Sequence, residues 1–312
     1  MRALITGASG FVGRHLSEHL LAAGNEVVGL SAHRARLPQG VVALTADLLD
    51  ADLTARTILA QRPEVIFHLA AQAYVPQAIA DPGQTLLNNS LAQLNVLEAA
   101  RRLEPVPVIL VAGSSEVYGA VPPERLPVTE DQPFRPSNPY AVSKVTQDML
   151  GLQYFLSYGL PVVRARPFNH IGPGQSDRFA VASFARQIAE AETGRGQPLL
   201  LVGNLGARRD FLDVRDVVRA YGVMARREYA GEVFNVASGV ARSVQDLLDA
   251  LLARATVPIE VRQDPARMRP SEAPLIVGDA SKLAAATGWR PEIPLCRSLQ
   301  NTLDEWRARM GA

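Results

Sequence analysis

Short apolar runs alternate with longer stretches of helical period through the first two thirds of the chain. The apolar runs predict strands over residues 2–6, 26–31, 41–45, 64–69, 106–112 and 161–167. Amphipathic spacing predicts helices over residues 11–23, 82–103 and 140–158. Strands that alternate with helices in this way are typical of successive βαβ units on a parallel sheet.

The pattern changes after residue 168, where glycine and proline interrupt shorter pieces. The run "NHIGPGQSDRF" (169–179) cannot continue a helix and predicts a loop of the kind that carries binding residues. "GEVFNVA" (231–237) predicts a return to the sheet, Ser243 is placed to cap the next helix, and Gly288 to end a later one. We therefore expect an α/β fold, a Rossmann-type doubly wound parallel sheet with a smaller C-terminal α/β lobe.

Three glycines, Gly7, Gly10 and Gly13, directly follow the first strand and open the first helix. Missing side chains at such positions allow a tight turn, close approach of a pyrophosphate and close packing of the helix on the sheet. Glycines also end strands for purely structural reasons. In this strand–turn–helix context, however, the pattern favours a dinucleotide site.

Tyr140 and Lys144 lie four residues apart in "NPYAVSK", so a helix places both on one face. A lysine there can stabilise a tyrosinate and bring the phenol pKa, ordinarily about 10, closer to working pH. Such pairs also arise by accident on surfaces, but the chain has only two lysines, Lys144 and Lys282. Ser114 lies at the end of the fifth strand, where it could serve as a turn hydroxyl.

The GxxGxxG spacing, "HLAA" at the end of the fourth strand and the Tyr140/Lys144 pair resemble the extended short-chain dehydrogenase/reductase (NAD-dependent epimerase/dehydratase) family. The resemblance covers essentially the whole chain. It implies that Ser114, Tyr140 and Lys144 are catalytic, with Ser114 in the family's Ser/Thr position, where it could hydrogen-bond the reacting carbonyl or alkoxide. It also implies that Lys144 bonds the nicotinamide ribose and that His68 packs under the cofactor. The implied cofactor contacts beyond the glycines are Phe11, Val12, Leu48, Leu69, Ala70 and Ala71.

The end of the second strand bears on the choice of cofactor. An NAD enzyme usually has an acid about 20 residues after the glycines to hold the ribose hydroxyls. Here that place reads "SAHR" (31–34), and residues 27–46 contain no acid. Ser31 and Arg34 can bond a 2′-phosphate, so NADP(H) is favoured and NAD(H) is the alternative, unless Arg34 is only a solvated surface residue. Asp47 resembles the family's adenine contact, or else caps a helix.

Three later segments resemble the nucleotide-sugar branch of the family, in particular its GDP-mannose pathway members: "RPFNHIGPGQ" (166–175), "GNLGARRDFLDVRDVVRAY" (203–221) and "RMRPSEAPLIVGD" (267–279). The resemblance implies that Asn169 contacts the sugar or diphosphate, that Arg209 and Arg269 contact the diphosphate, and that Glu272 contacts the base. Arg186 is a further expected substrate contact.

Structural ion pairs are the alternative for these arginines. Asp210, Asp213 and Asp216 lie close by, and they compete most strongly for Arg208 and Arg215. His170 has no assigned task.

Two chemistries compete within this branch, a 4,6-dehydratase and the reductase that consumes its product. The dehydratase pattern has Gln-Asp-Gly in the first glycine turn, usually Thr at the catalytic hydroxyl, and a longer chain. This chain has Ser9-Gly10-Phe11 and Ser114. The resemblance thus favours reduction of the C4 ketone of a GDP-4-keto-6-deoxy hexose to GDP-rhamnose or its epimer. Glu116 is either a base for elimination or a substrate-binding or structural residue.

Two further alternatives stay open. A nucleotide-sugar 4-epimerase would use the same centre and retain tightly bound NAD. A non-catalytic NAD(P)-binding regulator could share the fold, but such proteins commonly lose their reactive side chains, whereas Ser114, Tyr140 and Lys144 are all present.

Composition restricts the remaining partners. A net charge of +1 over 312 residues gives no field to hold nucleic acid or a membrane surface, and no apolar stretch reaches the roughly 18 residues that span a bilayer. The single cysteine, Cys296, and five scattered histidines predict neither a disulfide nor a metal site. Met1 leads straight into the first strand, so we expect a cytoplasmic protein.

Domain organisation and assembly are also expected from the resemblance. We expect an NAD(P)-binding domain over 1–168 with 208–239, and a nucleotide-sugar-binding lobe over 169–207 with 240–312. The helices around 82–103 and 137–158 resemble those that pair extended family members into homodimers with two-fold symmetry.

Overall fold

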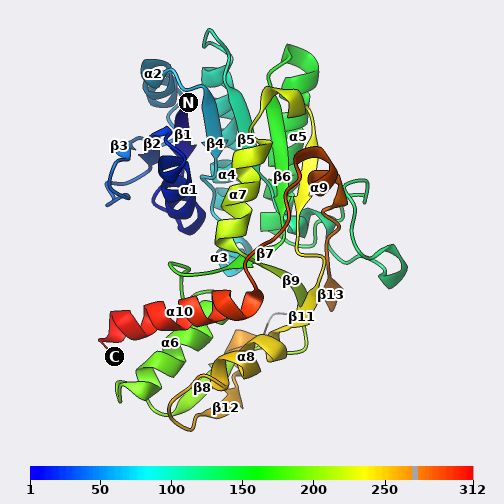
Figure 1. Cartoon of the computed structure of the whole chain (residues 1–312). Coiled ribbons are helices and arrows are strands. Elements are labelled where there is room, and N and C mark those ends of the chain that lie inside the picture. The colour runs from blue at the N-terminus through cyan, green and yellow to red at the C-terminus, as the bar shows by residue number, and fades with distance from the viewer. Residues whose placement is uncertain (269–272, 312) are drawn as a thin grey trace.

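Seven parallel strands form the central sheet of the computed structural model, which describes residues 1–268 and 273–311 (Figure 1). In hydrogen-bonded order they are β10 (Val233–Val236), β6 (Val162–Pro167), β5 (Val108–Ala112), β4 (Val65–His68), β1 (Arg2–Thr6), β2 (Glu26–Ser31) and β3 (Val42–Thr45). The chain runs outward from β1 in one direction and then, from β4, in the other. The carboxyl edge between β1 and β4 is therefore the topological switch point, where open α/β sheets bind ligands.

The inner strands of this sheet, β1, β2, β4, β5 and β6, feed two hydrophobic cores because successive side chains point to opposite faces. Leu4, Ile66 and Ile109 pack in one core. Their neighbours in sequence, Ile5, Phe67 and Leu110, pack in the other. Burial on both faces explains why these strands read as continuous apolar runs, and the six predicted strands are confirmed to within two residues at each end.

Helices cover both faces of the sheet (Figure 1). One face carries α2 (Ala51–Gln61), α4 (Pro82–Ala100) and α5 (Pro139–Tyr158), which pack on one another, and the other carries α1 (Phe11–Ala22) and α7 (Val214–Met224). The predicted helix over 82–103 ends at Ala100, and a short helix that the pattern did not predict, α3 (Val75–Ala80), precedes it.

The ends of α5 follow from local chemistry. Asn138 is the N-cap residue, and its side chain accepts a hydrogen bond from the Ala141 N–H. Pro139 occupies the first helical position, where its missing N–H costs nothing. Gly159 ends the helix with φ +65°, a left-handed conformation that favours glycine.

A second group of elements lies below the carboxyl edge of the central sheet in Figure 1. Its strands are β7 (Asn169–Ile171), β8 (Leu199–Val202), β9 (Arg208–Asp213), β11 (Ala241–Ser243), β12 (Glu260–Gln263) and β13 (Leu275–Ile276). β9 pairs with β7, β11 and β13, while β8 pairs with β12. Its helices α6 (Ala180–Glu192), α8 (Val244–Leu252) and α10 (Leu295–Met310) share a core that includes Phe184, Leu248 and Leu303.

Three predictions for the second half of the chain are confirmed. The "GEVFNVA" segment returns to the central sheet as β10, beside β6. Ser243 caps α8 in a reciprocal capping box with Asp246. Gly288 ends α9 (Ser281–Thr287), a helix that lies against β10, with φ +73°.

The expected division of the chain into 1–168 with 208–239 and 169–207 with 240–312 stays a proposal. Within the segment 208–239, α7 and β10 pack with the central sheet, whereas β9 is hydrogen-bonded in the second group. Within the described ranges, no helix combines the length and apolar character needed to cross a membrane.

Candidate active site

The first turn, between β1 and α1, has the shape of a phosphate cradle. Gly7 has φ +72°, and a Cβ there would lie 2.9 Å from the backbone nitrogen of Ala70. A Cβ on Gly13 would lie 2.3 Å from the Gly7 carbonyl oxygen, so only glycine lets α1 pack this closely on the turn. Gly10 is the N-cap of α1 and has no side chain to cover the first N–H groups of the helix. These open N–H groups are suited to a pyrophosphate.

The segment after β4 forms the opposite wall of this turn. The backbone N–H of Leu69 donates to the Thr6 carbonyl at 3.2 Å, and that of Ala70 to Thr6 Oγ1 at 3.2 Å. His68 lies beneath, buried, with its Nδ1 2.9 Å from Thr6 Oγ1. Burial, with a smaller contribution from the Lys144 charge, lowers the pKa of His68 to about 3, so this ring is neutral. A neutral buried ring is consistent with the expected packing role.

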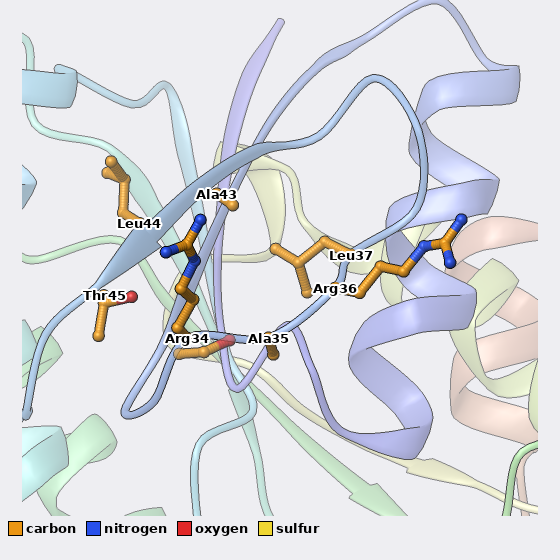
Figure 2. Close-up of a pocket in the computed structure, with 8 residues that line it drawn as sticks. Arg34, Ala35, Arg36, Leu37, Ala43, Leu44 and Thr45 are labelled. Atoms are coloured by element: carbon orange, nitrogen blue, oxygen red, sulfur yellow. The ribbon is translucent and has the colours of Figure 1, made fainter.

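The end of β2 opens onto a pocket of about 570 Å³ that Ser31, Arg34, Arg36, Leu44 and Thr45 help to line. Figure 2 shows the Arg34 side chain turned toward β3, beside Leu44 and Thr45, while Arg36 points away toward α1. Ser31 Oγ is buried and has no hydrogen-bond partner among the described residues. A buried hydroxyl without a partner and an exposed guanidinium match a 2′-phosphate.

Asp47 and Leu48 follow β3. Asp47 Oδ1 accepts from the Leu49 N–H at 3.0 Å, a local turn contact, and Leu48 is buried. The alternative that Asp47 caps the next helix is wrong, because the N-cap of α2 is Asp50, whose side chain accepts from the Leu53 N–H at 2.9 Å. Asp47 stays exposed at the carboxyl edge, as its predicted adenine contact requires.

Tyr140 and Lys144 lie one turn apart on α5, and both are buried. Lys144 Nζ lies 5.8 Å from the centre of the Tyr140 ring and donates to the Ala112 carbonyl at 2.8 Å. Burial lowers the pKa of Lys144 to about 7. Burial also raises the pKa of Tyr140 to about 12, opposed by a hydrogen bond with Ser114 and reinforced by the Glu116 charge. At neutral pH the phenol therefore keeps its proton.

Ser114 serves as a turn hydroxyl, which is one of its two predicted roles. Its Oγ accepts from the Glu116 N–H at 3.2 Å and so caps the 3₁₀ turn over Ser115–Tyr118. Ser114 also interacts with the Tyr140 phenol and lowers its pKa, against the larger effect of burial. The end of strand β5 thus places a hydroxyl near the phenol.

Glu116 has a partner that the sequence analysis missed. Its Oε2 accepts from Asn138 Nδ2 at 3.2 Å, and its charge reaches Tyr140. Asn138 stands directly before Pro139 and Tyr140, in the position of a helix N-cap, so its place in "NPY" could have been read as a cap. The bond to Glu116 joins residues 22 apart and has no local signature.

The residues expected to bind substrate lie in the second group. Asn169 is exposed at the start of β7, and Arg209 Nη1 donates to the Ala273 carbonyl at 2.6 Å. Arg186 pairs with Asp177 at 3.1 Å and with Glu190 at 2.5 Å. Arg269 and Glu272 lie outside the described residues.

One other prediction for this region has an outcome, and His170 makes a contact that was not predicted. The structural ion pair expected as the alternative for Arg215 is confirmed, because its Nη2 lies 2.7 Å from Asp213 Oδ2. His170, for which no role was predicted, stacks on Phe11 with 6.0 Å between ring centres and 9° between planes. The second group therefore contacts the first residue of α1.

Comparison with known proteins places the chain in a family. Residues 4–302 match the family model described as GDP-mannose 4,6 dehydratase. The chain is 42% identical over 310 residues to GDP-6-deoxy-D-mannose reductase from Pseudomonas aeruginosa, covering 99% of this chain and 98% of the relative. The structure of RMD from the same organism, complexed with NADPH, superposes with a TM-score of 0.85 at 40% identity and covers 99% of both chains.

A UDP-glucose 4-epimerase structure from Thermus thermophilus, in complex with NAD, has a TM-score of 0.88 at 33% identity and covers 98% of this chain and 99% of its own. The resemblance and the Rossmann-type fold expected from the sequence are thus confirmed. The chain belongs to the GDP-mannose 4,6 dehydratase family of extended short-chain dehydrogenases/reductases.

Proposed function

We propose that the protein is an NADPH-dependent reductase that converts the C4 ketone of a GDP-linked 4-keto-6-deoxy hexose to the alcohol, giving GDP-rhamnose or its epimer. The buried, protonated Tyr140 phenol, which interacts with Ser114 at the carboxyl edge of the sheet, carries the proposal. A phenol that keeps its proton at neutral pH suits an acid that must donate one. The likeness to the Pseudomonas reductase supports the choice of substrate.

The chain's own features fit the cofactor. Gly7, Gly10 and Gly13 would receive the pyrophosphate at the start of α1, and Ser31 and Arg34 would hold the 2′-phosphate. The remaining cofactor contacts would come from Phe11, Val12, Asp47, Leu48 and the segment 69–71. NADPH is preferred over NADH because the pocket at the end of β2 presents a hydroxyl and a guanidinium where an acid would repel the phosphate. When bound, NADPH supplies the hydride for C4.

The catalytic residues account for the proton. Tyr140 donates its phenolic proton to the oxygen at C4 as the ketone becomes an alcohol, and then regains a proton from water. Ser114 hydrogen-bonds the same oxygen and stabilises the charge that develops on it. Lys144, fixed by the Ala112 carbonyl, stabilises the tyrosinate and would bond the nicotinamide ribose.

We assign substrate binding to Asn169, Arg186 and Arg209 in the second group, with Arg269 and Glu272 from the segment outside the described residues. Arginine is suited to a diphosphate because its planar donors can bond two oxygens at once. This assignment makes the second group the nucleotide-sugar-binding lobe and the central sheet the NAD(P)-binding domain.

A dehydratase is the second candidate, and Glu116 is the observation that favours it. A half-buried carboxylate beside Tyr140 is suitable as a base that removes the proton next to a ketone. A 4-epimerase would use the same trio but keep its NAD through a full cycle. A cofactor-binding regulator without activity is disfavoured because Ser114, Tyr140 and Lys144 come together in one site.

We also propose a cytoplasmic homodimer that pairs through α4 and α5. Val142, Met149 and Leu156 are exposed apolar residues on α5, each two turns from the next, so they form one stripe along the helix. Leu87 on α4 is exposed as well, with 51% of its surface accessible. An apolar stripe on two packed helices is the kind of surface that a second copy covers in a two-fold dimer.

The experiment offers GDP-, dTDP- and UDP-linked 4-keto-6-deoxy sugars with NADPH in parallel and identifies each product. The proposal predicts reduction of the GDP-linked sugar ahead of the other two. Conversion of GDP-mannose without net cofactor consumption would instead identify a dehydratase. Epimerisation of a UDP-sugar by protein that releases NAD on denaturation would identify an epimerase.

A further inference from the structure

Asn138 uses both ends of its side-chain amide. Its Oδ1 accepts from the Ala141 N–H at 2.8 Å and caps α5, while its Nδ2 donates to Glu116 Oε2 at 3.2 Å. A backbone N–H can only donate, so the amide oxygen must face the helix. The amide nitrogen therefore faces Glu116, whose Oε2 accepts the second bond.

This bond crosses the junction between the two elements that carry the chemistry. Glu116 belongs to the 3₁₀ turn after β5, directly behind Ser114, and Asn138 precedes Tyr140 by two residues. Helix capping alone would require only the oxygen of Asn138. The amide nitrogen adds a second function, because it binds the Glu116 carboxylate from the start of α5, the helix that carries Tyr140.

We propose that Asn138 is a positioning residue, which holds the Glu116 carboxylate in the site and thereby fixes the negative charge that faces the Tyr140 phenol. The inference rests on the proposed reductase function. The titratable groups that interact with Tyr140 are Lys144 on its own helix, Glu116 from the turn after β5 and Tyr221 from α7. Of the carboxylates near the phenol in the described chain, Glu116 is the one whose charge raises the pKa of Tyr140.

A reductase gains from this arrangement because its acid must stay protonated until the sugar oxygen takes the proton. A carboxylate that turned toward solvent would leave Tyr140 easier to ionise, and the acid would be lost at lower pH. The expected consequence of losing the Asn138 bond is a lower kcat and an earlier alkaline fall in activity, with little change in cofactor binding.

Two substitutions separate capping from positioning. Serine is a good N-cap, so Asn138→Ser keeps the bond to the Ala141 N–H but has no amide to reach Glu116. Asn138→Asp also keeps the cap, but it places a second carboxylate against the first. Both variants should melt near the wild-type temperature, which shows that α5 still begins correctly.

The experiment measures reduction of GDP-4-keto-6-deoxymannose by NADPH across the alkaline range for wild type, N138S, N138D, E116Q and the N138S/E116Q double variant. We expect N138S to lose about tenfold in kcat with an unchanged KM for NADPH and to lose activity at lower pH than wild type. N138D should lose more. The double variant should match E116Q, because Asn138 acts through Glu116.

Wild-type kcat and pH profile in N138S would overturn the proposal and leave Asn138 as a cap alone. Losses that multiply in the double variant would also overturn it, since they would show that Asn138 acts independently of Glu116. A crystal structure of N138S supplies a readout without turnover, in which we expect the Glu116 carboxylate to leave its place. If wild type reduces no keto sugar while the carboxylate moves, the proposed function fails and the positioning role stands. A carboxylate that stays in place in N138S would overturn the positioning role.

Discussion

Lys144 Nζ donates a hydrogen bond to the carbonyl oxygen of Ala112 at 2.8 Å. The bond joins α5 to the end of β5, and Ser114 follows Ala112 by two residues along the chain. One contact between a helix and a strand thus sets the spacing of the hydroxyl, the phenol and the amine. It also holds an amine in a buried place, where the charged form is disfavoured.

The buried amine makes stability depend on pH. The pKa of Lys144 in the folded chain is about 7, against an ordinary value of 10.5. Between these values the unfolded chain binds a proton that the folded chain does not, so the free energy of unfolding rises with pH, by at most about 1.4 kcal/mol per pH unit. The contribution is flat below about pH 7.

Lys144→Met should remove this dependence. The difference in the free energy of unfolding between cofactor-free wild type and the variant should therefore shift in favour of wild type as the pH rises from about 7 to 10.5. Lys282→Met is the matched control, because Lys282 is an exposed lysine paired with Glu232 at 2.8 Å. Denaturant unfolding at several pH values measures both. Parallel pH curves for wild type and Lys144→Met would contradict the burial of the amine.

Cofactor preference should depend on Arg34. Arg34→Ala removes a charge-assisted bond to the 2′-phosphate, so the KM for NADPH should rise about tenfold or more while that for NADH stays nearly unchanged. Arg36→Ala is the control. Arg36 lines the same pocket, but its side chain points toward α1 in Figure 2, so its removal should change neither KM. Equal effects of Arg34→Ala on both cofactors would remove Arg34 from the phosphate site.

Most of the central sheet could be predicted from the sequence because its inner strands are buried on both faces. Ile66 and Phe67 feed opposite cores, so burial alone makes β4 a continuous apolar run. The same reasoning fails for β12, whose four residues Glu260–Gln263 are all exposed and pair only with β8. Strands of that kind depend on tertiary pairing, which no local pattern records.

Part of the candidate site could likewise be predicted from the sequence, and part could not. Helix spacing predicted that Tyr140 and Lys144 share one face, and the family resemblance implied that Ser114 joins them. The structure brings the three residues together. The Lys144 bond to Ala112 and the Asn138 bond to Glu116 each join residues more than 20 apart in sequence. Their geometry depends on how α5 packs against β5, so residue types alone could not predict them.

The glycines of the first turn should differ in how they tolerate a methyl group. A Cβ on Gly13 would lie 2.3 Å from the Gly7 carbonyl oxygen and 2.7 Å from Ala8 Cα, both backbone atoms. Gly13→Ala should therefore lower the free energy of unfolding by about 1–3 kcal/mol and weaken NADPH binding. A Cβ on Gly10 would lie 3.2 Å from the Gly7 carbonyl oxygen, so Gly10→Ala should cost much less stability.

Thermal unfolding and NADPH titration compare the two glycine variants. Equal melting temperatures for Gly13→Ala and wild type would show that α1 does not need this close approach.

The proposed dimer should depend on the apolar stripe of α5. Met149 lies between Val142 and Leu156, so Met149→Glu would place a charge at the centre of the interface and should give a monomer. Val240→Glu is the control, because Val240 is an exposed apolar residue outside α4 and α5. Sedimentation at micromolar concentration measures both. A wild-type monomer, or a Met149→Glu dimer, would contradict the proposed interface.

The central claim is that Tyr140 supplies the proton for reduction of a GDP-linked keto sugar. Tyr140→Phe keeps the ring and its packing but removes the proton, so kcat should fall by about 10²- to 10⁴-fold while both ligands still bind. The most direct measurement is the loss of NADPH absorbance when GDP-4-keto-6-deoxymannose is added to wild type and to Tyr140→Phe, with GDP-mannose as the control substrate. The account predicts rapid NADPH oxidation with the keto sugar in wild type alone, and none with GDP-mannose. It would be contradicted by conversion of GDP-mannose without NADPH loss, or by equal NADPH oxidation in the two proteins.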